Sequence, residues 1–217
     1  MPTDSTITDL STRKQNPHEC SVKVDGRIVA VLPQSAVERM GLRVGSAWDD
    51  TLAHQVSEAA AFHKACLQAM QRLNRRAHSR HELGKALGRL GHDGELIERV
   101  LDHLAALSAF DDEQLGRALV RETLDRDPAG PTLIRARLTR RGLAADLIEC
   151  LLEETQQRAD PVSEACSLAR QRLHRMVQLN PTTRQRRLWG LLARRGFDEQ
   201  TIEAALERIG ETGVEGG

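Results

Sequence analysis

Arginine side chains on the segment 183–195 are the groups of this chain best suited to bind a charged ligand. The side of this segment that we expect to pack inward consists of Leu188, Trp189, Leu191 and Leu192. Arg187 and Arg194 are seven residues apart and therefore share the opposite, exposed stripe of a helix, with Arg186 nearby and Gly190 beside them. A small residue between arginines lets a phosphate or a carboxylate approach the backbone. The pattern predicts a partner-binding stripe, against the alternative of a solvated helix face.

Four further arginines extend the predicted partner surface to other segments. One is an outward-facing candidate in the middle of the chain, and the others surround a helix junction nearer the N-terminus. They are Arg135, Arg75, Arg76 and Arg80. Arg141 and Arg195 have a structural explanation instead, because each is expected in the last turn of a helix, where positive charge is favourable.

The patterns that could carry catalysis have simpler structural explanations. Ser79 stands between His78 and His81, but with Glu82 it matches the capping box of a helix start. The adjacent carboxylates Asp111–Asp112 suit a helix N-terminus, in preference to a charged partner contact or a metal. The glycines nearby do not have the spacing of a phosphate-binding loop. We therefore predict that the protein is not an enzyme and has no catalytic residue, cofactor or metal.

The charge of the chain is balanced overall but unevenly distributed. The 217 residues have a formal net charge of zero, whereas the stretch 135–195 holds 13 arginines and 6 acidic residues. This asymmetry predicts a surface for a polyanion or for an acidic partner protein. Only 2% of the residues are aromatic, which argues against recognition of single strands by base stacking. Any contact with nucleic acid should therefore be made to phosphates, and it should be sensitive to salt.

The cysteines indicate a reducing compartment, and the apolar runs are too short for a membrane segment. The four cysteines form no CxxC pair, and Cys66, Cys150 and Cys166 fall among apolar neighbours, where we expect small core residues. The sequence contains no apolar run near 18 residues and no signal-peptide pattern. We predict a soluble cytoplasmic protein without a membrane segment.

A helical unit recurs three times with a period near 50 residues. The segments RHELGKALGRLGHDGELIERVL, LIRARLTRRGLAADLIECLL and RRLWGLLARRGFDEQTIEAAL align on Gly91, Gly142 and Gly196. The apolar positions on both sides of each glycine have the helical period, which predicts a helix, a glycine-capped turn and a second helix. One such unit cannot bury its apolar face alone, so stacked copies should share a core.

The whole chain is predicted to be mostly α, with three tandem three-helix repeats in an elongated curved array after a small N-terminal β-hairpin module. The predicted domains are a flexible segment 1–19, a hairpin and short helix at 20–48, repeats at 49–108, 109–158 and 159–210, and a disordered tail at 211–217. Asp25 and Gly26 predict a type I′ hairpin turn. The expected helices of the three repeats are 50–76, 79–90 and 93–108, then 111–126, 130–141 and 144–157, then 161–179, 183–195 and 198–210.

The segment 161–179 shows how one predicted helix should pack. Its apolar stripe comprises Val162, Ala165, Cys166, Ala169, Leu173, Met176 and Val177. We interpret the stripe as core rather than as a groove for a partner. Arg172 falls outside it.

Several motifs, in order, resemble those of the RecX family of regulatory proteins. The motifs are HSRHELGKAL at 78–87, FDDEQLGRALV at 110–120, GPTLIRARLTRRGL at 130–143 and LLARRGF at 191–197. The hairpin around VDG and the sequence GLRVG at 41–45 resemble an N-terminal extension of that family. The resemblance covers about residues 20–210.

The resemblance implies a non-enzymatic modulator of RecA, the recombinase that forms filaments on single-stranded DNA. RecX-like proteins bind along the groove of the RecA–DNA filament and usually limit its activity, which tempers recombinational repair and the SOS response. The expected partner is this nucleoprotein filament, with single- or double-stranded DNA contacted through phosphates as a further possibility, and the protein is expected to be a monomer. The alternative is a DNA-binding regulator with tandem helix–turn–helix-like units, a class that usually needs a dimer.

Overall fold

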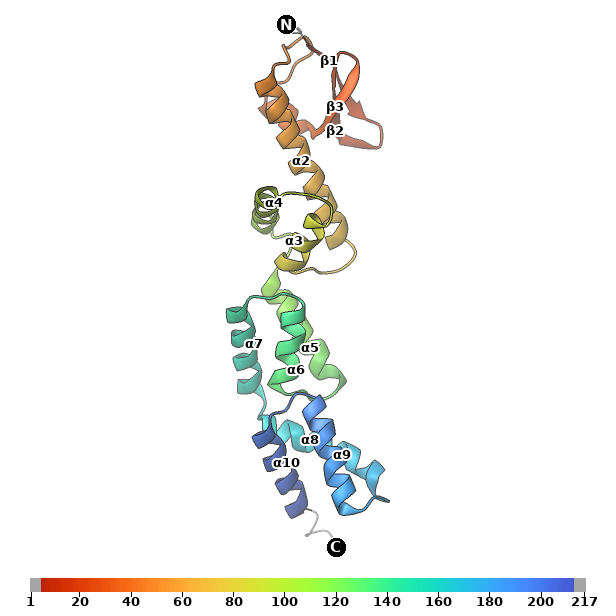
Figure 1. The fold of residues 1–217 in the computed structure, drawn as a ribbon, viewed down its shortest axis with the longest axis vertical. Coiled ribbons are helices and arrows are strands. Elements are labelled where there is room, and N and C mark those ends of the chain that lie inside the picture. The colour runs from red at the N-terminus through yellow and green to blue at the C-terminus, as the bar shows by residue number, and fades with distance from the viewer. Residues whose placement is uncertain (1–4, 213–217) are drawn as a thin grey trace. The chain divides into compact units, whose positions relative to one another are not determined.

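The computed structural model describes residues 5–212 and is mostly helical, with one small sheet near the N-terminus (Figure 1). This confirms the predicted fold class. The chain divides into two compact units. The first contains the described residues up to Arg76 together with Gly84–Ala109, and the second contains Ala77–Leu83 together with the described residues from Phe110 onward. Residues 1–4 and 213–217, which belong to the predicted flexible ends, lie outside the described residues.

The first unit begins with a three-stranded antiparallel sheet in the order β1-β2-β3. The strands are β1 (Ile7–Arg13), β2 (Asn16–Val24) and β3 (Arg27–Pro33). Asp25 and Gly26 join β2 to β3 with φ angles of 50° and 79°, the pair of positive values that a type I′ turn requires. The predicted hairpin is therefore confirmed.

The strand β1 and the start of β2 occupy residues 7–13 and 16–19 of the predicted flexible segment 1–19, and the prediction is wrong for these residues. Ile7 is 1% exposed in the core of the first unit. Asp9 of β1 forms an ion pair with Lys23 of β2, with 2.8 Å between Oδ2 and Nζ. The segment looks polar because Ile7 and Leu10 are the only apolar residues of β1. Two such residues, three positions apart, do not show the alternation that is typical of a strand.

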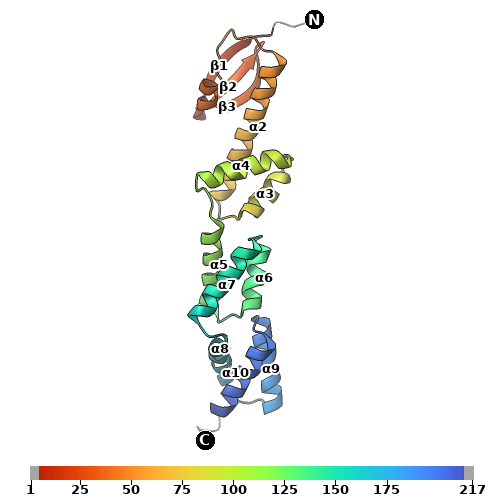
Figure 2. The same ribbon diagram turned by 90° about the vertical axis from the view of Figure 1, so that its left-hand side faces the viewer.

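Two helices complete the packing of the sheet. They are α1 (Gln34–Arg39) and α2 (Asp50–Leu73), and the first part of α2 lies against the sheet (Figure 2). The side chain of Asp49 accepts a hydrogen bond of 2.7 Å from the backbone N–H of Leu52, which is the predicted N-cap. The core here includes Ile7, Val22, Val24, Leu32, Ala36 and Val56. Val56 of α2 joins this core, so α2 is the element that holds the sheet.

The next two helices are α3 (Arg80–Gly88) and α4 (Gly94–Ala106). The predicted capping box at the start of α3 is confirmed, because Glu82 N–H donates to Ser79 Oγ at 3.1 Å and Ser79 N–H donates to Glu82 Oε2 at 3.2 Å. Gly91 joins the two helices with a φ of +84°. The α3–α4 turn is therefore the glycine-capped turn that the repeat predicts.

The second unit continues with two more sets of helices. These are α5 (Asp112–Arg126), α6 (Pro131–Arg140) and α7 (Ala145–Arg158), followed by α8 (Pro161–Leu173), a 3₁₀ turn η1 (His174–Met176), α9 (Pro181–Arg194) and α10 (Glu199–Thr212). Asp111 caps α5 by accepting from Gln114 N–H at 2.9 Å, and Asp112 accepts from Arg80 N–H at 2.9 Å. The structure therefore confirms the predicted capping role of Asp111 and Asp112. Burial raises the pKa of the Asp112 carboxyl, against the hydrogen bond from Arg80.

The repeat register agrees with the burial of the aligned positions. Leu87, Leu138 and Leu192, four residues before the three glycines, are all 0% exposed. The aligned isoleucines Ile148 and Ile202 are also buried. The aligned leucines are therefore core residues in all three copies, whereas the aligned isoleucine is buried in the second and third copies and Ile97 is half-buried in the first.

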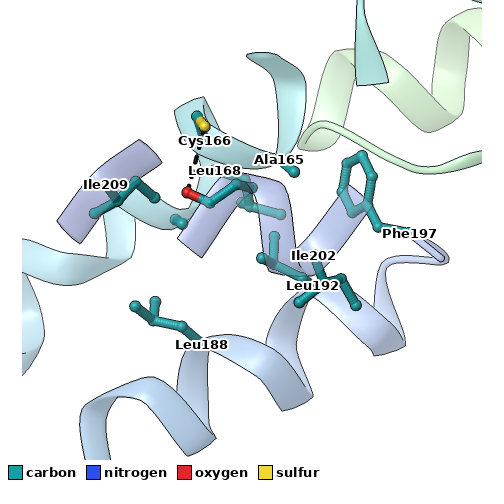
Figure 3. Close-up of a cluster of buried hydrophobic side chains, with 10 residues drawn as sticks. Ala165, Cys166, Leu168, Leu188, Leu192, Phe197, Ile202 and Ile209 are labelled. Atoms are coloured by element: carbon teal, nitrogen blue, oxygen red, sulfur yellow. Dashed lines mark hydrogen bonds between the residues drawn. The ribbon is translucent and has the colours of Figure 1, made fainter. Parts of the chain in front are cut away.

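The last set of helices encloses its own apolar core (Figure 3). Cys166 is buried in it and lies 3.5 Å from the carbonyl oxygen of Ala205. The predicted stripe on 161–179 is correct in its first part, but the helix ends at Leu173 and Val177 is 70% exposed. The 3₁₀ turn changes the helical period, which carries Val177 away from the core. Leu168, outside the predicted stripe, is 0% exposed.

The four cysteines are all free thiols. Cys166 is buried as predicted and Cys66 is half-buried, but Cys150 is exposed, which corrects its predicted core position. Desolvation raises the pKa of the Cys66 thiol to about 11, so this thiol is held in its protonated, unreactive form.

Each Arg–Gly turn of the second unit contacts a preceding segment of that unit. Arg195 donates to the carbonyl oxygens of Pro128, at 2.9 Å, and Asp127, while Thr132 N–H donates to the Gly196 carbonyl at 3.1 Å. Burial lowers the pKa of the Arg195 guanidinium. This arginine therefore joins two repeats, a stronger role than favourable charge at a helix end.

The equivalent turn at Arg141 makes the same kind of junction. Arg141 Nε donates to Glu82 Oε1 at 3.0 Å, and Ser79 Oγ donates to the Arg141 carbonyl at 2.5 Å. A Cβ atom added to Gly142 would lie 2.2 Å from His81 Cδ2. The two junctions use the same positions of the repeat.

Candidate partner-binding surface

Helix α9 is the platform of the candidate surface. Asn180 begins it by accepting from Thr183 N–H at 2.8 Å, and Pro181 occupies the first turn, so the helix starts two residues before the predicted 183. Leu188 and Leu192 are buried on its inner side, as predicted. These two residues fix which stripe of α9 faces outward.

An open pocket of about 640 Å³ lies along the outer stripe of α9. Its lining residues are Arg172, Met176, Arg186, Arg187, Gly190, Leu191 and Arg194. The structure thus brings together the three arginines that the sequence singles out on this helix. Leu191, expected on the inward side, is only half-buried and lies at the pocket.

Arg172 and Met176 belong to this pocket but were not predicted. Both come from the preceding segment, α8 and η1, which packs across α9. Arg172 lies on the helix before α9, and its only sequence signal was its position outside the apolar stripe of 161–179. A contact between separate helices cannot be found from the spacing within either one.

The charge of the pocket is uniformly positive. No acidic residue lines it, and within the described part of the chain Arg186, Arg187 and Arg194 have no ion pair. Arg172 Nη2 lies 3.2 Å and 3.3 Å from the two carboxylate oxygens of Asp127, but its buried Nε has no hydrogen-bond partner among the described residues. The pocket therefore concentrates guanidinium groups that a bound anion would neutralise.

Gly190 brings one of these guanidinium groups close to the helix. A Cβ atom at this position would lie 3.2 Å from Arg194 Nη1, tighter than an ordinary contact. Glycine inside a helix costs about 0.5–1 kcal/mol relative to alanine. The exposed Arg194 side chain can shift by a few tenths of an ångström, so this contact alone does not require a glycine.

The other predicted arginines have different surroundings. Arg135 forms a two-point ion pair with Glu149, with Nη2 and Oε2 at 2.9 Å, so its charge is already compensated. The backbone of Arg80 donates to Asp112, and Arg75 and Arg76 belong to the first unit. None of these four lines the α9 pocket.

The described residues offer no arrangement typical of a metal centre or of nucleophilic catalysis. No group of three or more His, Cys, Asp or Glu side chains among them is placed to hold a metal ion. The Ser79 hydroxyl is engaged by the capping box and by the Arg141 carbonyl. No described helix is long and apolar enough to cross a bilayer.

The three sets of helices place this chain in the class of helical-repeat proteins. A family profile described as "RecX, first three-helix domain" matches residues 65–104. Regulatory protein RecX of Pelodictyon phaeoclathratiforme is 32% identical over 141 residues, which cover 65% of this chain and 86% of that protein. Regulatory protein RecX of Chlorobium limicola is 31% identical over 163 residues, which cover 75% of this chain and 96% of that protein.

Solved structures share the fold. A crystal structure of regulatory protein RecX superposes with a TM-score of 0.76 at 20% identity, over 94% of this chain and 99% of that chain. RecX from Lactobacillus salivarius superposes with a TM-score of 0.61 at 20% identity, over 68% of this chain and 96% of that chain. The chain belongs to the RecX family of regulatory proteins.

Proposed function

We propose that this protein binds the filament that RecA forms on single-stranded DNA and restrains its ATPase and recombinase activity. Membership of the RecX family, with relatives matched over most of their length, carries the proposal. The relatives are named regulatory proteins, and their name is consistent with a role in regulating RecA. A non-enzymatic role also fits the described residues, whose polar clusters serve as helix caps and junctions.

The α9 pocket supports the same proposal from the side of electrostatics. A RecA filament presents both DNA phosphates and protein carboxylates, and a cluster of guanidinium groups attracts either of them. Arg186, Arg187 and Arg194 are exposed, so they can reach a partner without rearrangement of the core. Arg75, Arg76, Arg80 and Arg135 are kept as secondary candidates for the partner surface.

The direct test measures RecA on single-stranded DNA. Substoichiometric amounts of this protein should slow DNA-dependent ATP hydrolysis and strand exchange by the RecA of the same organism, while the protein alone hydrolyses neither ATP nor DNA. Co-sedimentation should be stronger with RecA–DNA filaments than with naked DNA. Equal binding to naked DNA together with unchanged ATP hydrolysis would reject the proposal and favour the DNA-binding regulator.

A pair of charge reversals tests whether the α9 surface is the one used. Arg187→Glu combined with Arg194→Glu should change stability by no more than about 1 kcal/mol, because both side chains are exposed. Filament binding should weaken strongly, since two attractive charges become repulsive. If the double variant binds and inhibits like the parent, the partner surface lies elsewhere on the chain.

A further inference from the structure

We propose that the α9 pocket receives an acidic peptide segment that carries an apolar side chain between its carboxylates. The inference rests on the proposed function in one respect, because it assigns this segment to the protein component of the filament rather than to the DNA.

The rim of the pocket favours an anionic ligand, because Arg186, Arg187 and Arg194 have no ion pair among the described residues, whereas Arg172 pairs with Asp127. Its four arginines, Arg172, Arg186, Arg187 and Arg194, surround a volume of about 640 Å³, within the range of about 300–1,000 Å³ that is usual for ligand sites. This space is large enough for several peptide residues. Because no carboxylate lines the pocket, the anions must come from the ligand.

The floor of the pocket distinguishes a peptide from a nucleic acid. Met176 and Leu191 are half-buried and contribute apolar surface between the guanidinium groups. A run of phosphates would leave this surface without an apolar partner, and the pocket has no aromatic side chain on which a base could stack. A flexible methionine adapts well to an aliphatic side chain. The combination of a basic rim and an aliphatic floor matches alternating acidic and apolar residues.

One arginine of the pocket, Arg172, already pairs with a carboxylate that lies outside the lining. Arg172 donates to both carboxylate oxygens of Asp127, at 3.2 Å and 3.3 Å, and leaves its Nε unpaired. The same pairing is available to the exposed arginines of α9 when a carboxylate enters.

Two residues of the pocket, Arg187 and Gly190, are specific to the third repeat, whereas Arg194 aligns with Arg140 and Arg89. At the positions of Arg187 and Gly190, the second repeat has Leu133 and Ala136, and the first repeat has Glu82 and Lys85 when the three glycines are aligned. The repeat architecture by itself therefore does not require these residues. Their occurrence in one copy only is what a dedicated binding site predicts.

The test uses the full chain and three fluorescent probes in the absence of RecA. The probes are a peptide that alternates Glu with Leu, the same peptide with Ser in place of Leu, and an oligothymidylate of equal charge. Fluorescence anisotropy at one fixed salt concentration should show the Glu–Leu peptide binding at least about tenfold more tightly than the other two. This factor corresponds to about 1.4 kcal/mol, the scale of partly burying one leucine.

Two matched variants locate the binding site. Arg194→Glu should weaken binding of the Glu–Leu peptide by about tenfold or more. Arg140→Glu reverses the charge at the equivalent position of α6, outside the pocket, and should change binding by no more than about threefold. Equal effects of the two variants would show that only net charge matters and would overturn the proposal.

The outcomes also separate this inference from the proposed function. Oligothymidylate binding that equals or exceeds Glu–Leu peptide binding, with loss in Arg194→Glu, would assign the pocket to nucleic-acid phosphates and reject the peptide. Specific peptide binding without any effect on RecA would support the pocket and reject the proposed function. Inhibition of RecA by Arg194→Glu at the parental level, with no peptide binding by the parent, would reject only the pocket.

Discussion

The three glycines of the repeat allow the junctions to be tested one methyl group at a time. Gly91, Gly142 and Gly196 all have positive φ angles, of 84°, 71° and 82°. Replacement by alanine therefore imposes a similar backbone strain at each position, about 1 kcal/mol. The surroundings of the added methyl group differ strongly among the three.

The magnitude follows from the atoms that each methyl group would meet. A Cβ on Gly91 meets nothing within 4 Å, whereas a Cβ on Gly196 would lie 2.2 Å from the backbone nitrogen of Leu133. On Gly142 the nearest atom, at 2.2 Å, belongs to the side chain of His81, which can move partly aside. Overpacking typically costs about 1–3 kcal/mol more. The expected order of destabilisation is Gly196→Ala first, then Gly142→Ala, then Gly91→Ala.

Thermal unfolding and hydrogen exchange provide the measurements. At about 2–4 °C per kcal/mol for a chain of this size, Gly91→Ala should lower Tm by about 2–4 °C and Gly196→Ala by about two to four times as much. In Gly196→Ala the amides of Gly130 and Thr132, which donate to Arg195 and Gly196, should lose protection. Equal Tm changes in Gly91→Ala and Gly196→Ala, with these amides still protected, would refute the junction.

Two further predictions concern the cores of the two units. Leu138→Asp places a charge at a position that is 0% exposed and should destabilise the protein by several kcal/mol, measured by thermal circular dichroism. The control Thr139→Asp, on the exposed side of the same helix, should change the stability little. An unchanged melt of Leu138→Asp would contradict the repeat register. Burial alone would raise the pKa of the Glu19 carboxyl, but hydrogen bonds from His63 and Arg13 outweigh it, so this pKa is lowered. The stabilisation that ionised Glu19 contributes is present above the ordinary carboxyl pKa and is lost as the pH falls through the lowered pKa of the folded state. Urea unfolding of Glu19→Gln should therefore show a smaller loss of stability on acidification than the parent, and parallel pH curves would contradict this role.

The fold was predictable wherever the local sequence marks the start or the end of a helix. Asp49, Ser79 and Asp111 each satisfy a nearby backbone N–H, so the helix starts were readable within a residue or two. The strand β1 was assigned to a flexible segment because its pairing with β2 depends on a partner strand rather than on its own composition. The exposed position of Val177 was missed because the 3₁₀ turn changes the period of the helix.

The candidate surface was predictable only in the part that lies on one helix. Spacing alone places Arg187 and Arg194 on one stripe of α9, and the structure gives both a position at the pocket. Arg172 enters through the packing of α8 on α9, and the charge of Arg135 is compensated by Glu149 from the next helix. Both facts depend on contacts between helices, which the spacing of one helix does not contain.

The Arg–Gly turns give the repeats of the second unit a direction. Each junction joins an Arg–Gly turn, at Arg141–Gly142 or Arg195–Gly196, to the segment that leads into an earlier helix of that unit, through an arginine side chain that donates and turn carbonyls that accept. The aligned turn of the first repeat has Leu90 in place of the arginine, and its Gly91 would meet nothing within 4 Å. A segment that contains the residues leading into α6 and the Arg–Gly turn after α6 therefore carries both halves of a junction. Such a segment is the natural unit of duplication, and the array can lengthen by copying it in register without new junction residues.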